Sequence, residues 1–578
     1  MAAEKLVLGI NAAYHESAAA LVRGEDAIFA IEEERLSRIK HGKKPSVGNP
    51  DQLPWMALNA CLAAAGVDLE DVEQIAYSLV PGKRAATIGA DPYPIDRAAG
   101  FGTQQGEDEF DRRVRSVSAS FSQPVSFVPH HLAHAASAFY PSPFDEAAVM
   151  VADGIGENST MWLGRGTSTG LERLEEIPYP HSLGMLWERI AAYLGFTEFD
   201  APKVMGLAAY GDPGRFEVPM RRLLEVPDPD GGEPLGQAPP FRVDAQLARF
   251  RAADVLGLES LFGPRRHPGE RPEEARFADV AAALQAQTEL ALLASCRRLH
   301  RVTGLPQFAY AGGVALNCVA NARLERDGPF DALYIPPAAH DAGTALGAAW
   351  LLSGGRAGGA SPEQRSPFLG TAWPPAEIDD AIARAGLSSQ RVSDPAALAA
   401  QLLTQGKLVA WFTGRLELGP RALGYRSLLA DPRDRRMREL LNNRVKHREP
   451  FRPFAASVLA ESLDDWFQTP ARRPGAAASR DLMLLAYRAR AERVATIPAV
   501  LHRDNSCRIQ TVDAVRDPVY HRLISQFASR TGVPLILNTS FNDNEPIVSS
   551  PEDALRTFQA TDLDALFLED RLVRGSGI

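Results

Sequence analysis

Short apolar runs separated by turn residues open the chain. Residues 5–10, 17–24 and 26–35 have the pattern of three successive strands, which predicts an opening β-meander. A second set with the same form follows at residues 146–154 and 159–166. Two similar openings of strands and glycines indicate an internally duplicated α/β fold.

Alanine-rich amphipathic segments lie between and after these strands. Residues 55–66 and 278–304 have the apolar spacing of long helices. A mixture of such helices and strands is typical of a layered α/β architecture. We therefore predict that residues 1–353 form one α/β domain.

A stretch rich in Gly, Ser and Pro interrupts the periodic pattern at residues 354–375, which predicts a linker. Strand signals resume at residues 407–414 and 533–540, with helical stretches between them. We therefore expect a second α/β domain over residues 376–578.

The composition is that of a globular protein with more than one domain. The chain has 578 residues, of which 45% are hydrophobic and 23% charged, and this length exceeds what one core supports. The formal net charge of -10 argues against a surface that binds nucleic acid or an anionic membrane. The four cysteines lie far apart, and the sequence has neither a signal peptide nor an apolar run of about 20 residues. We expect a cytoplasmic protein.

The sequence VPHHLAHAASAFYP places three histidines within five positions of a predicted helix. His130 and His134 are four residues apart, so both imidazoles project from one helix face. Asp153 follows an apolar strand, and Asp341 precedes a helix of small residues. Two imidazoles and two carboxylates suit iron, manganese or zinc. In the plain alternative, the histidines cap the helix and the aspartates form turns.

The sequence AYAGGVALNC follows a predicted strand and opens a helix. Gly312 and Gly313 would let a phosphate or nucleotide approach the positive end of the helix dipole. A tight turn without a ligand is the alternative.

The second domain carries a local excess of positive charge. Between Arg421 and Arg452 there are ten Lys or Arg residues and four Asp or Glu residues. Guanidinium groups bind phosphate oxygens in pairs, so Arg421, Lys446 and Arg452 predict a polyphosphate site. For residues 433–440 we prefer a solvated basic helix face.

Six separated motifs together resemble the antibiotic and nodulation-factor O-carbamoyltransferase family across nearly the whole chain: PHHLAHAASAF, KVMGLAAYG, GGVALNC, GPRALGYRSLLADPR, VKHREPFRPF and LNTSFN. The resemblance implies an N-terminal duplicated actin/sugar-kinase-type (ASKHA) domain, related to the tRNA threonylcarbamoyl transferase, and a C-terminal YrdC-like α/β domain. It also implies that the C-terminal domain forms carbamoyl-adenylate from ATP and carbamoyl phosphate. The N-terminal domain would then transfer the carbamoyl group to a hydroxyl of a small-molecule acceptor.

The resemblance also implies roles for individual residues. His15 would be the catalytic base or would position the carbamoyl group. The metal ligands would be His130, His134, Asp153 and Asp341, with Fe2+ as our first choice and Mn2+ or Zn2+ as alternatives. Mg2+ would accompany ATP. The remaining positions group by ligand: Gly184, Lys203, Gly312, Gly313 and Asn317 for carbamoyl-adenylate; Arg421, Lys446, Arg452, Arg508 and Asn538 for ATP and carbamoyl phosphate; Glu32 and Lys40 for the acceptor.

The acceptor itself is open at this stage. The residues just before His15, Asn11 to Tyr14, include no acidic side chain, which favours a neutral acceptor such as a macrolide, a polyketide or its sugar over an aminoglycoside. Three other classes of protein remain as alternatives: a tRNA-modifying threonylcarbamoyl enzyme, a zinc peptidase, and an actin-like nucleotide-binding protein without catalysis. The peptidase lacks the glutamate of HEXXH.

Overall fold

A computed structural model describes residues 4–43, 49–84, 104–250, 252–355, 359–470 and 479–575. These residues divide into two compact units. The first lies within Met1–Ala30 and Lys43–Arg365, and the second lies within Ile31–Gly42, Ser366–Ala471 and Ser479–Ile578.

The boundary at Ser366 falls inside the predicted linker 354–375, of which residues 356–358 lie outside the described residues. The segment Ile31–Gly42 groups with the second unit, although it is part of the N-terminal sequence. The second unit is therefore built from two distant parts of the chain.

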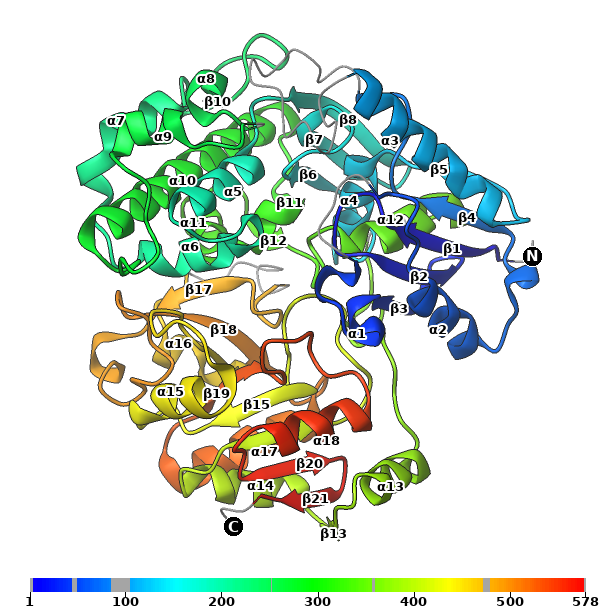
Figure 1. Ribbon diagram of the computed structural model, residues 1–578, viewed down its shortest axis with the longest axis vertical. Helices are drawn as coiled ribbons and strands as arrows, with labels where there is room; N and C mark the ends of the chain where they lie inside the picture. Colours follow the sequence, from blue (N-terminus) through cyan, green and yellow to red (C-terminus); the bar gives the residue numbers. More distant parts are fainter. Residues whose placement is uncertain are drawn as a thin grey trace. The chain divides into compact units, whose positions relative to one another are not determined.

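The first unit contains two five-stranded sheets (Figure 1). In one sheet the strand order is β3-β2-β1-β4-β5, with β1 antiparallel to β2 and parallel to β4. Its strands are β1 (Leu6–Asn11), β2 (Ala18–Arg23), β3 (Asp26–Glu32), β4 (Gln74–Tyr77) and β5 (Val125–Phe127). The predicted meander is confirmed, because β1, β2 and β3 are neighbours in that order.

The second sheet repeats this topology with the order β8-β7-β6-β11-β12. β6 is antiparallel to β7 and parallel to β11, as β1 is to β2 and β4. Its strands are β6 (Ala147–Ala152), β7 (Ser159–Thr167), β8 (Gly170–Pro178), β11 (Gln307–Ala311) and β12 (Ala332–Tyr334). The duplicated α/β fold that the sequence predicts is therefore confirmed.

Two buried helices, α4 (His130–Phe139) and α12 (Ala342–Ser353), pack against each other between these sheets. α12 contacts β1 and β2, whereas α4 contacts β6 and β11. Because nearly every side chain of both helices is buried, their polar residues have to find partners inside the unit.

The other helices of the first unit surround this core, and the long helix α10 is prominent among them in Figure 1. Helices α5, α6, α7 and α11 all contact α10. Their bounds are α2 (Trp55–Ala65), α3 (Gln104–Ser116), α5 (Leu183–Tyr193), α6 (Ala201–Ala208), α7 (Glu217–Leu223), α8 (Ala245–Ala248), α9 (Leu256–Phe262), α10 (Ala275–Thr303) and α11 (Cys318–Asp327), with a short strand pair β9 (Leu224–Glu225) and β10 (Arg242–Val243).

The second unit is built on a nine-stranded mixed sheet of order β13-β21-β20-β14-β15-β19-β16-β18-β17. Its strands are β13 (Gln390–Arg391), β14 (Val409–Phe412), β15 (Arg426–Ala430), β16 (Ala455–Leu459), β17 (Leu485–Arg488), β18 (Ser506–Val512), β19 (Leu535–Ser540), β20 (Ala565–Leu568) and β21 (Arg571–Arg574). This unit is also α/β, as the sequence predicts.

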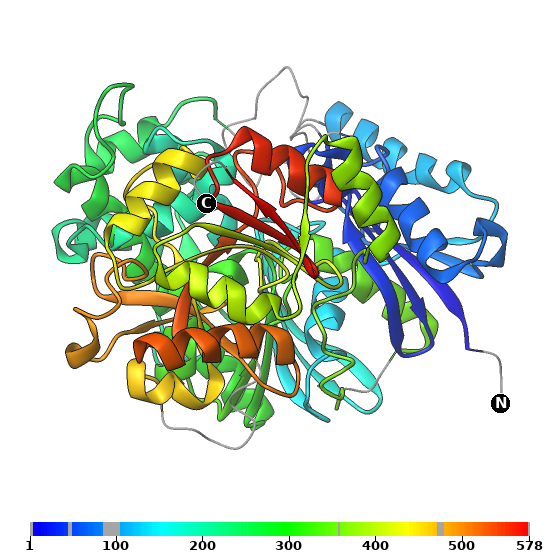
Figure 2. The ribbon, with the colours of Figure 1, turned by 90° about the horizontal axis from the view of Figure 1, so that it is seen from below.

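Helices cover both faces of this sheet. Figure 2 shows α14 (Pro395–Thr404) and α17 (Pro518–Thr531) on one side and α18 (Pro551–Ala560) on the other. The remaining helices are α1 (Glu34–Ser37), α13 (Pro375–Arg384), α15 (Arg436–Leu441) and α16 (Leu463–Trp466). Among the described residues of the whole chain, no helix combines the length and apolarity needed to cross a membrane.

Candidate functional site

Helix α4 presents two histidines to the interior of the first unit. His130 and His134 are fully buried, and their ring centroids are 4.8 Å apart. Nδ1 of His130 lies 3.1 Å from the carbonyl oxygen of Ser78. A carbonyl can only accept, so Nδ1 carries the proton, and the lone pair of the neutral ring is on Nε2. The sequence prediction that both rings share one helix face is confirmed.

Two carboxylates face these rings. Nε2 of His130 lies 3.4 Å from Asp153 Oδ2 and 3.7 Å from Asp341 Oδ1, and Nε2 of His134 lies 3.8 and 3.5 Å from the same two oxygens. Asp341 precedes α12 but makes no side-chain capping bond to it. Asp153 accepts a hydrogen bond from the Gly313 N–H through its other oxygen, Oδ1, at 3.0 Å. Neither aspartate is therefore only a turn former.

The four side chains fit a metal ion. One ligand atom from each lies within 4.8 Å of the others, and all four residues are buried. Among the described residues, Nε2 of His130 and Nε2 of His134 have no hydrogen-bond partner. Tetrahedral ligands at about 2.0–2.1 Å from a metal stand roughly 3.4 Å apart, close to the observed N–O separations. Nitrogen and carboxylate donors suit iron, manganese or zinc.

The histidines and aspartates of this cluster shift one another's pKa values. Burial lowers the pKa of His130, but Asp153 and Asp341 outweigh it and hold this pKa well above the usual value. Burial and Asp341 raise the pKa of Asp153, but His130 and His134 bring it down to about 2. Burial also raises the pKa of Asp341, but His15, His130 and His134 hold it well below its ordinary value. Both carboxylates are therefore ionised at neutral pH, and a metal ion that binds them would displace the proton from His130 Nε2.

The third histidine of the motif has a different environment. His131 Nδ1 lies 3.1 Å from Ser159 Oγ, and its Nε2 is 3.9 Å from Asp153 Oδ2. Burial lowers the pKa of His131 to about 3, so the ring is neutral. His131 therefore lies beside the predicted ligand Asp153 and outside the group of four.

His15 lies at the edge of the cluster. Its Nδ1 is 3.8 Å from Asp341 Oδ2, and its side chain is 35% exposed. Asn11 Nδ2 donates to the carbonyl oxygens of His15 and Glu16 at 3.0 and 3.1 Å, which fixes the loop. Lys43 Nζ donates to the Ala12 carbonyl at 2.6 Å. The structure thus brings the predicted catalytic histidine next to the predicted metal ligands, with one side open.

Glu188 on α5 is a neighbour of this site that the sequence reasoning missed. Burial raises the pKa of Glu188 to about 7, His15 opposes the rise, and Glu198, Asp153 and Asp341 add to it. A single glutamate on an amphipathic helix carries no sequence signal. Only the packing of α5 shows that it lies near the ligands.

Three of the residues predicted to bind carbamoyl-adenylate lie around the Asp153 turn. Gly313 donates its N–H to Asp153, and Gly312 has a φ of 98° in a place where a Cβ would come within 2.1 Å of the Ala152 carbonyl oxygen. A Cβ on Gly184 would lie 2.6 Å from the Gly154 nitrogen. The backbone therefore approaches this turn closely from two sides.

The other two predicted residues of that group have partners of their own. Asn317 caps α11 by accepting from the Ala320 N–H at 3.0 Å, and its Nδ2 donates to Gln285 at 3.0 Å. Lys203 Nζ lies 3.2 Å from Asp200. No described contact joins either residue to the four metal ligands, and their binding roles stay predictions.

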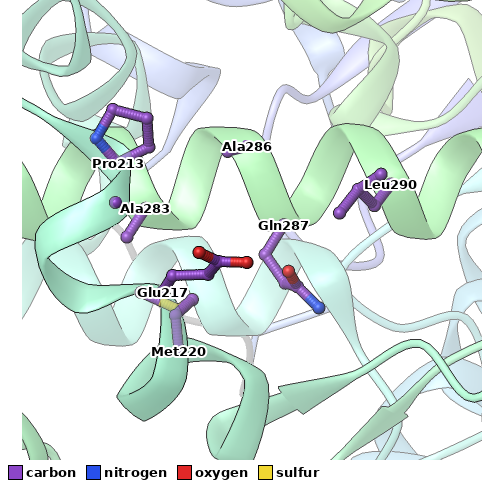
Figure 3. A pocket seen from close by; sticks show the side chains of 8 residues that line it. Pro213, Glu217, Met220, Ala283, Ala286, Gln287 and Leu290 are labelled. Atoms are coloured by element: carbon purple, nitrogen blue, oxygen red, sulfur yellow. The ribbon is translucent and has the colours of Figure 1, made fainter.

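The first unit also contains an open pocket of about 260 Å³ between α7, α10 and the short 3-10 turn Pro213–Phe216 (Figure 3). Ala283, Ala286, Gln287 and Leu290 of α10 line one side, and Glu217 and Met220 of α7 line the other. None of the residues predicted from the sequence borders it.

In the second unit, Lys446 is the centre of a cationic cluster. Its buried Nζ donates to the carbonyl oxygens of Ser540 and Asn542 at 2.5 and 2.8 Å and to Asn542 Oδ1 at 2.6 Å. Burial lowers the pKa of Lys446 well below its ordinary value, and Arg448, Arg452 and Lys40 lower it further. The predicted Lys446 and Arg452 therefore lie close enough to repel each other.

Arg448 is a second residue that the sequence reasoning missed. Burial lowers the pKa of Arg448 to about 9, with Arg452 and Arg508 as the next causes. The motif VKHREPFRPF contains Arg448 and Arg452, but the sequence alone does not show that Arg448 is buried among other cations. We use the name cationic cluster for four side chains whose positive charges act on one another: Lys446, Arg448, Arg452 and Arg508.

Asn538, Arg421, Glu32 and Lys40 complete the predicted set in this unit. Asn538 is buried on β19, and its Nδ2 donates to Ser457 Oγ at 2.9 Å. Lys40 lies near enough to Lys446 to lower its pKa. Glu32 Oε1 accepts a hydrogen bond from the Gly419 N–H at 2.7 Å, two residues before Arg421. The acceptor contacts expected of Glu32 and Lys40 stay predictions.

Known families match both units. The family described as Carbamoyltransferase N-terminus matches residues 6–350, and the family described as Carbamoyltransferase C-terminus matches residues 400–575. Both matches together cover most of the chain. The resemblance drawn from the six sequence motifs is therefore confirmed.

Individual relatives agree with these matches. The chain is 36% identical to nodulation protein NolNO of Sinorhizobium fredii, over 98% of this chain and 79% of the relative. It is 31% identical to the 3'-hydroxymethylcephem-O-carbamoyltransferase of Streptomyces clavuligerus, over 65% of each chain. Among solved structures, full-length HypF in its phosphate- and nucleotide-bound form aligns with a TM-score of 0.34 at 13% identity, covering 61% of this chain and 56% of HypF. The chain belongs to the carbamoyltransferase family and is a carbamoyltransferase.

Proposed function

We propose that this carbamoyltransferase forms carbamoyl-adenylate from ATP and carbamoyl phosphate in its second unit and transfers the carbamoyl group to a hydroxyl in its first unit. One observation carries the proposal: a buried cluster for a cation beside His15 in one unit, together with a cluster of mutually repelling cations in the other. A cytoplasmic setting belongs to the proposal, because the four cysteines are free and buried.

The cationic cluster suits two anionic substrates. Hydrolysis of carbamoyl phosphate releases phosphate and carbamate, and a carbamate oxygen then attacks the α-phosphorus of ATP and expels pyrophosphate. Repulsion between these anions opposes the attack, and fixed positive charges lower that barrier. Arg421, Lys446, Arg452, Arg508 and Asn538 are the proposed binding residues, with Mg2+ on the triphosphate. The buried Arg448 joins them.

In the first unit, the acceptor oxygen attacks the carbamoyl carbon, the bond to AMP breaks, and the hydroxyl proton leaves. His15 is the proposed proton acceptor, because it is partly exposed and lies 3.8 Å from Asp341, which would stabilise the imidazolium. Gly184, Lys203, Gly312, Gly313 and Asn317 would surround the adenylate. A divalent metal, Fe2+ by preference and otherwise Mn2+ or Zn2+, on His130, His134, Asp153 and Asp341 would supply a Lewis acid for the adenylate phosphate or carbonyl.

The proposed acceptor is a small molecule, with a neutral macrolide or polyketide hydroxyl as the first class to test. No acidic residue immediately precedes His15 in the sequence, which favours a neutral acceptor. The carboxyl group of Glu188 nevertheless lies near His15 and would attract an ammonium group. An aminoglycoside is therefore the second class to test.

The His15→Asn variant tests the division of labour between the units. With ATP and carbamoyl phosphate, we expect it to release pyrophosphate at the wild-type rate, because the cationic cluster is unchanged. In a panel of hydroxylated acceptors analysed by mass spectrometry, it should yield no product with an added carbamoyl group. His267→Asn, at an exposed position, is the control. Normal transfer by His15→Asn would refute the assigned role.

A further inference from the structure

A single glycine in the second unit is held at both of its backbone polar atoms. The Gly419 N–H donates to Glu32 Oε1 at 2.7 Å, and the Gly419 carbonyl accepts from Arg35 Nη2 at 2.8 Å. Arg35 Nη2 and Glu32 Oε1 are 3.4 Å apart, so the two side chains also pair with each other. Both are nearly inaccessible, with 1% and 2% of their surface exposed.

The segment that supplies these side chains is anchored to the same unit at a second place. Arg38 donates to the carbonyl oxygens of Ile547 and Pro546 at 2.7 and 2.6 Å, and its Nη2 is 3.1 Å from Glu545. Glu32 and Arg35 therefore reach Gly419 from a fixed support.

Gly419 begins the turn that leads to Arg421. Its φ of 102° is in the left-handed region, and Pro420 restricts the next φ. On the far side of Arg421, the Ala422 carbonyl accepts a hydrogen bond from Asn538 Nδ2 at 3.3 Å. The backbone of Arg421 is thus held from both sides, by Gly419 before it and by Ala422 after it.

A buried ion pair contributes little net stability to a turn. Removing two charges from water opposes folding, and apolar side chains of similar volume would often stabilise a protein more. What the pair does provide is a fixed direction, since the carboxylate and the guanidinium bind the two peptide groups on either side of the Gly419 Cα. Such an arrangement suits a place where the next side chain has to be aimed.

We propose that Glu32 and Arg35 are positioning residues for Arg421. They hold the backbone on both sides of the Gly419 Cα and so aim the Arg421 guanidinium at the anionic substrates. This inference rests on the proposed function, because it assumes that Arg421 binds ATP or carbamoyl phosphate. It also gives Glu32 a role different from the acceptor contact expected from the sequence.

A double-mutant cycle on pyrophosphate release tests this inference. The variants are Glu32→Ala, Arg421→Ala and the double variant, with ATP and carbamoyl phosphate as substrates. Misplacing a binding group by about 1 Å can lower a rate about 100-fold, so Glu32→Ala should lower kcat/KM by roughly 10- to 100-fold. In the Arg421→Ala background the same change should lower it less than about twofold, because the group that Glu32 positions is already gone.

Two further variants separate positioning from loss of stability. Glu32→Gln keeps an oxygen that can accept from Gly419 and should recover part of the activity. Arg571→Ala removes another buried arginine of the second unit, one that pairs with Asp379. It should lower the melting temperature, and its effect on pyrophosphate release should be the same with or without Arg421.

The outcomes distinguish this inference from the proposed function. If the wild-type protein releases no pyrophosphate, the proposed function fails. If wild type is active and Arg421→Ala is impaired, but Glu32→Ala has the same effect in both backgrounds, the positioning role is overturned and the function stands. If Glu32→Ala does not fold, the cycle is run with Arg35→Lys, for which the same criterion applies.

Discussion

The two candidate sites solve opposite electrostatic problems. In the first unit, two imidazoles face two carboxylates in a buried group, which carries two negative charges when both rings are neutral. In the second unit, Lys446, Arg448, Arg452 and Arg508 have the same sign, and burial and mutual repulsion both lower the pKa of Lys446 and Arg448. The first arrangement offers four ligand atoms to a cation, whereas in the second the positive charges outnumber the nearby carboxylates of Glu449 and Asp543.

The difference shows in how each site is supported. The metal-type cluster leaves the Nε2 atoms of His130 and His134 without hydrogen-bond partners among the described residues. Lys446, in contrast, has its ammonium group tied to carbonyl and amide oxygens of Ser540 and Asn542. We conclude that the first site presents its ligand atoms without partners, whereas the second holds its central ammonium group with neutral oxygens of the chain.

The largest expected effect comes from breaking the metal-type cluster. His130→Ala should abolish stoichiometric binding of a divalent metal, measured by metal analysis after dialysis. It leaves buried carboxylates short of a partner, and breaking a buried ion pair lowers the free energy of unfolding by about 3–5 kcal/mol. Transfer to an acceptor should be lost with the metal.

The control for this change is His300→Ala, which replaces a histidine of α10 that packs on Phe330. It should bind metal normally. Full metal occupancy in His130→Ala would mean that the four residues are not the ligands.

A change in the cationic cluster should separate activity from stability. Arg452→Met removes one of the repelling charges around Lys446 and Arg448, and with it the partly exposed ion pair to Glu449 at 3.6 Å. These effects oppose each other, so the melting temperature should change little. Loss of one preorganised group at a charged transition state typically costs 10²- to 10³-fold in rate, and we expect pyrophosphate release to fall about 100-fold.

Arg436→Met is the matched control, because Arg436 is paired with Asp434 on an exposed helix end. It should leave pyrophosphate release unchanged. An Arg452→Met protein that is destabilised and fully active would contradict the anion-binding interpretation.

The smallest effect concerns pH and Glu188. Because the pKa of Glu188 is raised from 4.5 to about 7, the unfolded chain ionises first as the pH rises. The wild type therefore loses stability between about pH 4.5 and 7, and Glu188→Gln does not. For this partly exposed carboxyl group we expect about 1–2 kcal/mol in favour of the variant at pH 8.

The measurement is thermal unfolding at pH 5 and pH 8, with a chelator present. Added divalent metal should shrink the difference at pH 8, since a nearby cation favours the ionised carboxylate. Glu73→Gln, at an exposed position, should show no pH-dependent difference. An equal difference for Glu188→Gln at both pH values would show that this group does not titrate as described.

Sequence patterns predicted those features that depend on short spacings. The four-residue spacing of His130 and His134 fixes their common face, and Asp153 is found because it ends an apolar strand. The roles of Glu188 and Arg448 escaped prediction, because each depends on charges brought near by distant parts of the chain. The order of strands in a sheet also depends on distant parts of the chain. β14 pairs with β20, with Val409 beside Ala565, and no local pattern specifies that partner.

The grouping of Ile31–Gly42 with the second unit has a practical consequence for dissecting the enzyme. A C-terminal fragment begun at Ser366 would contain the cationic cluster but would lack the carboxylate and guanidinium that hold Gly419. Separate expression of the second unit therefore requires residues 31–42 as well. They can be fused ahead of Ser366 or added as a separate peptide. By the same reasoning, a gene split at the linker would deliver two fragments, of which the C-terminal one lacks the residues that hold Gly419.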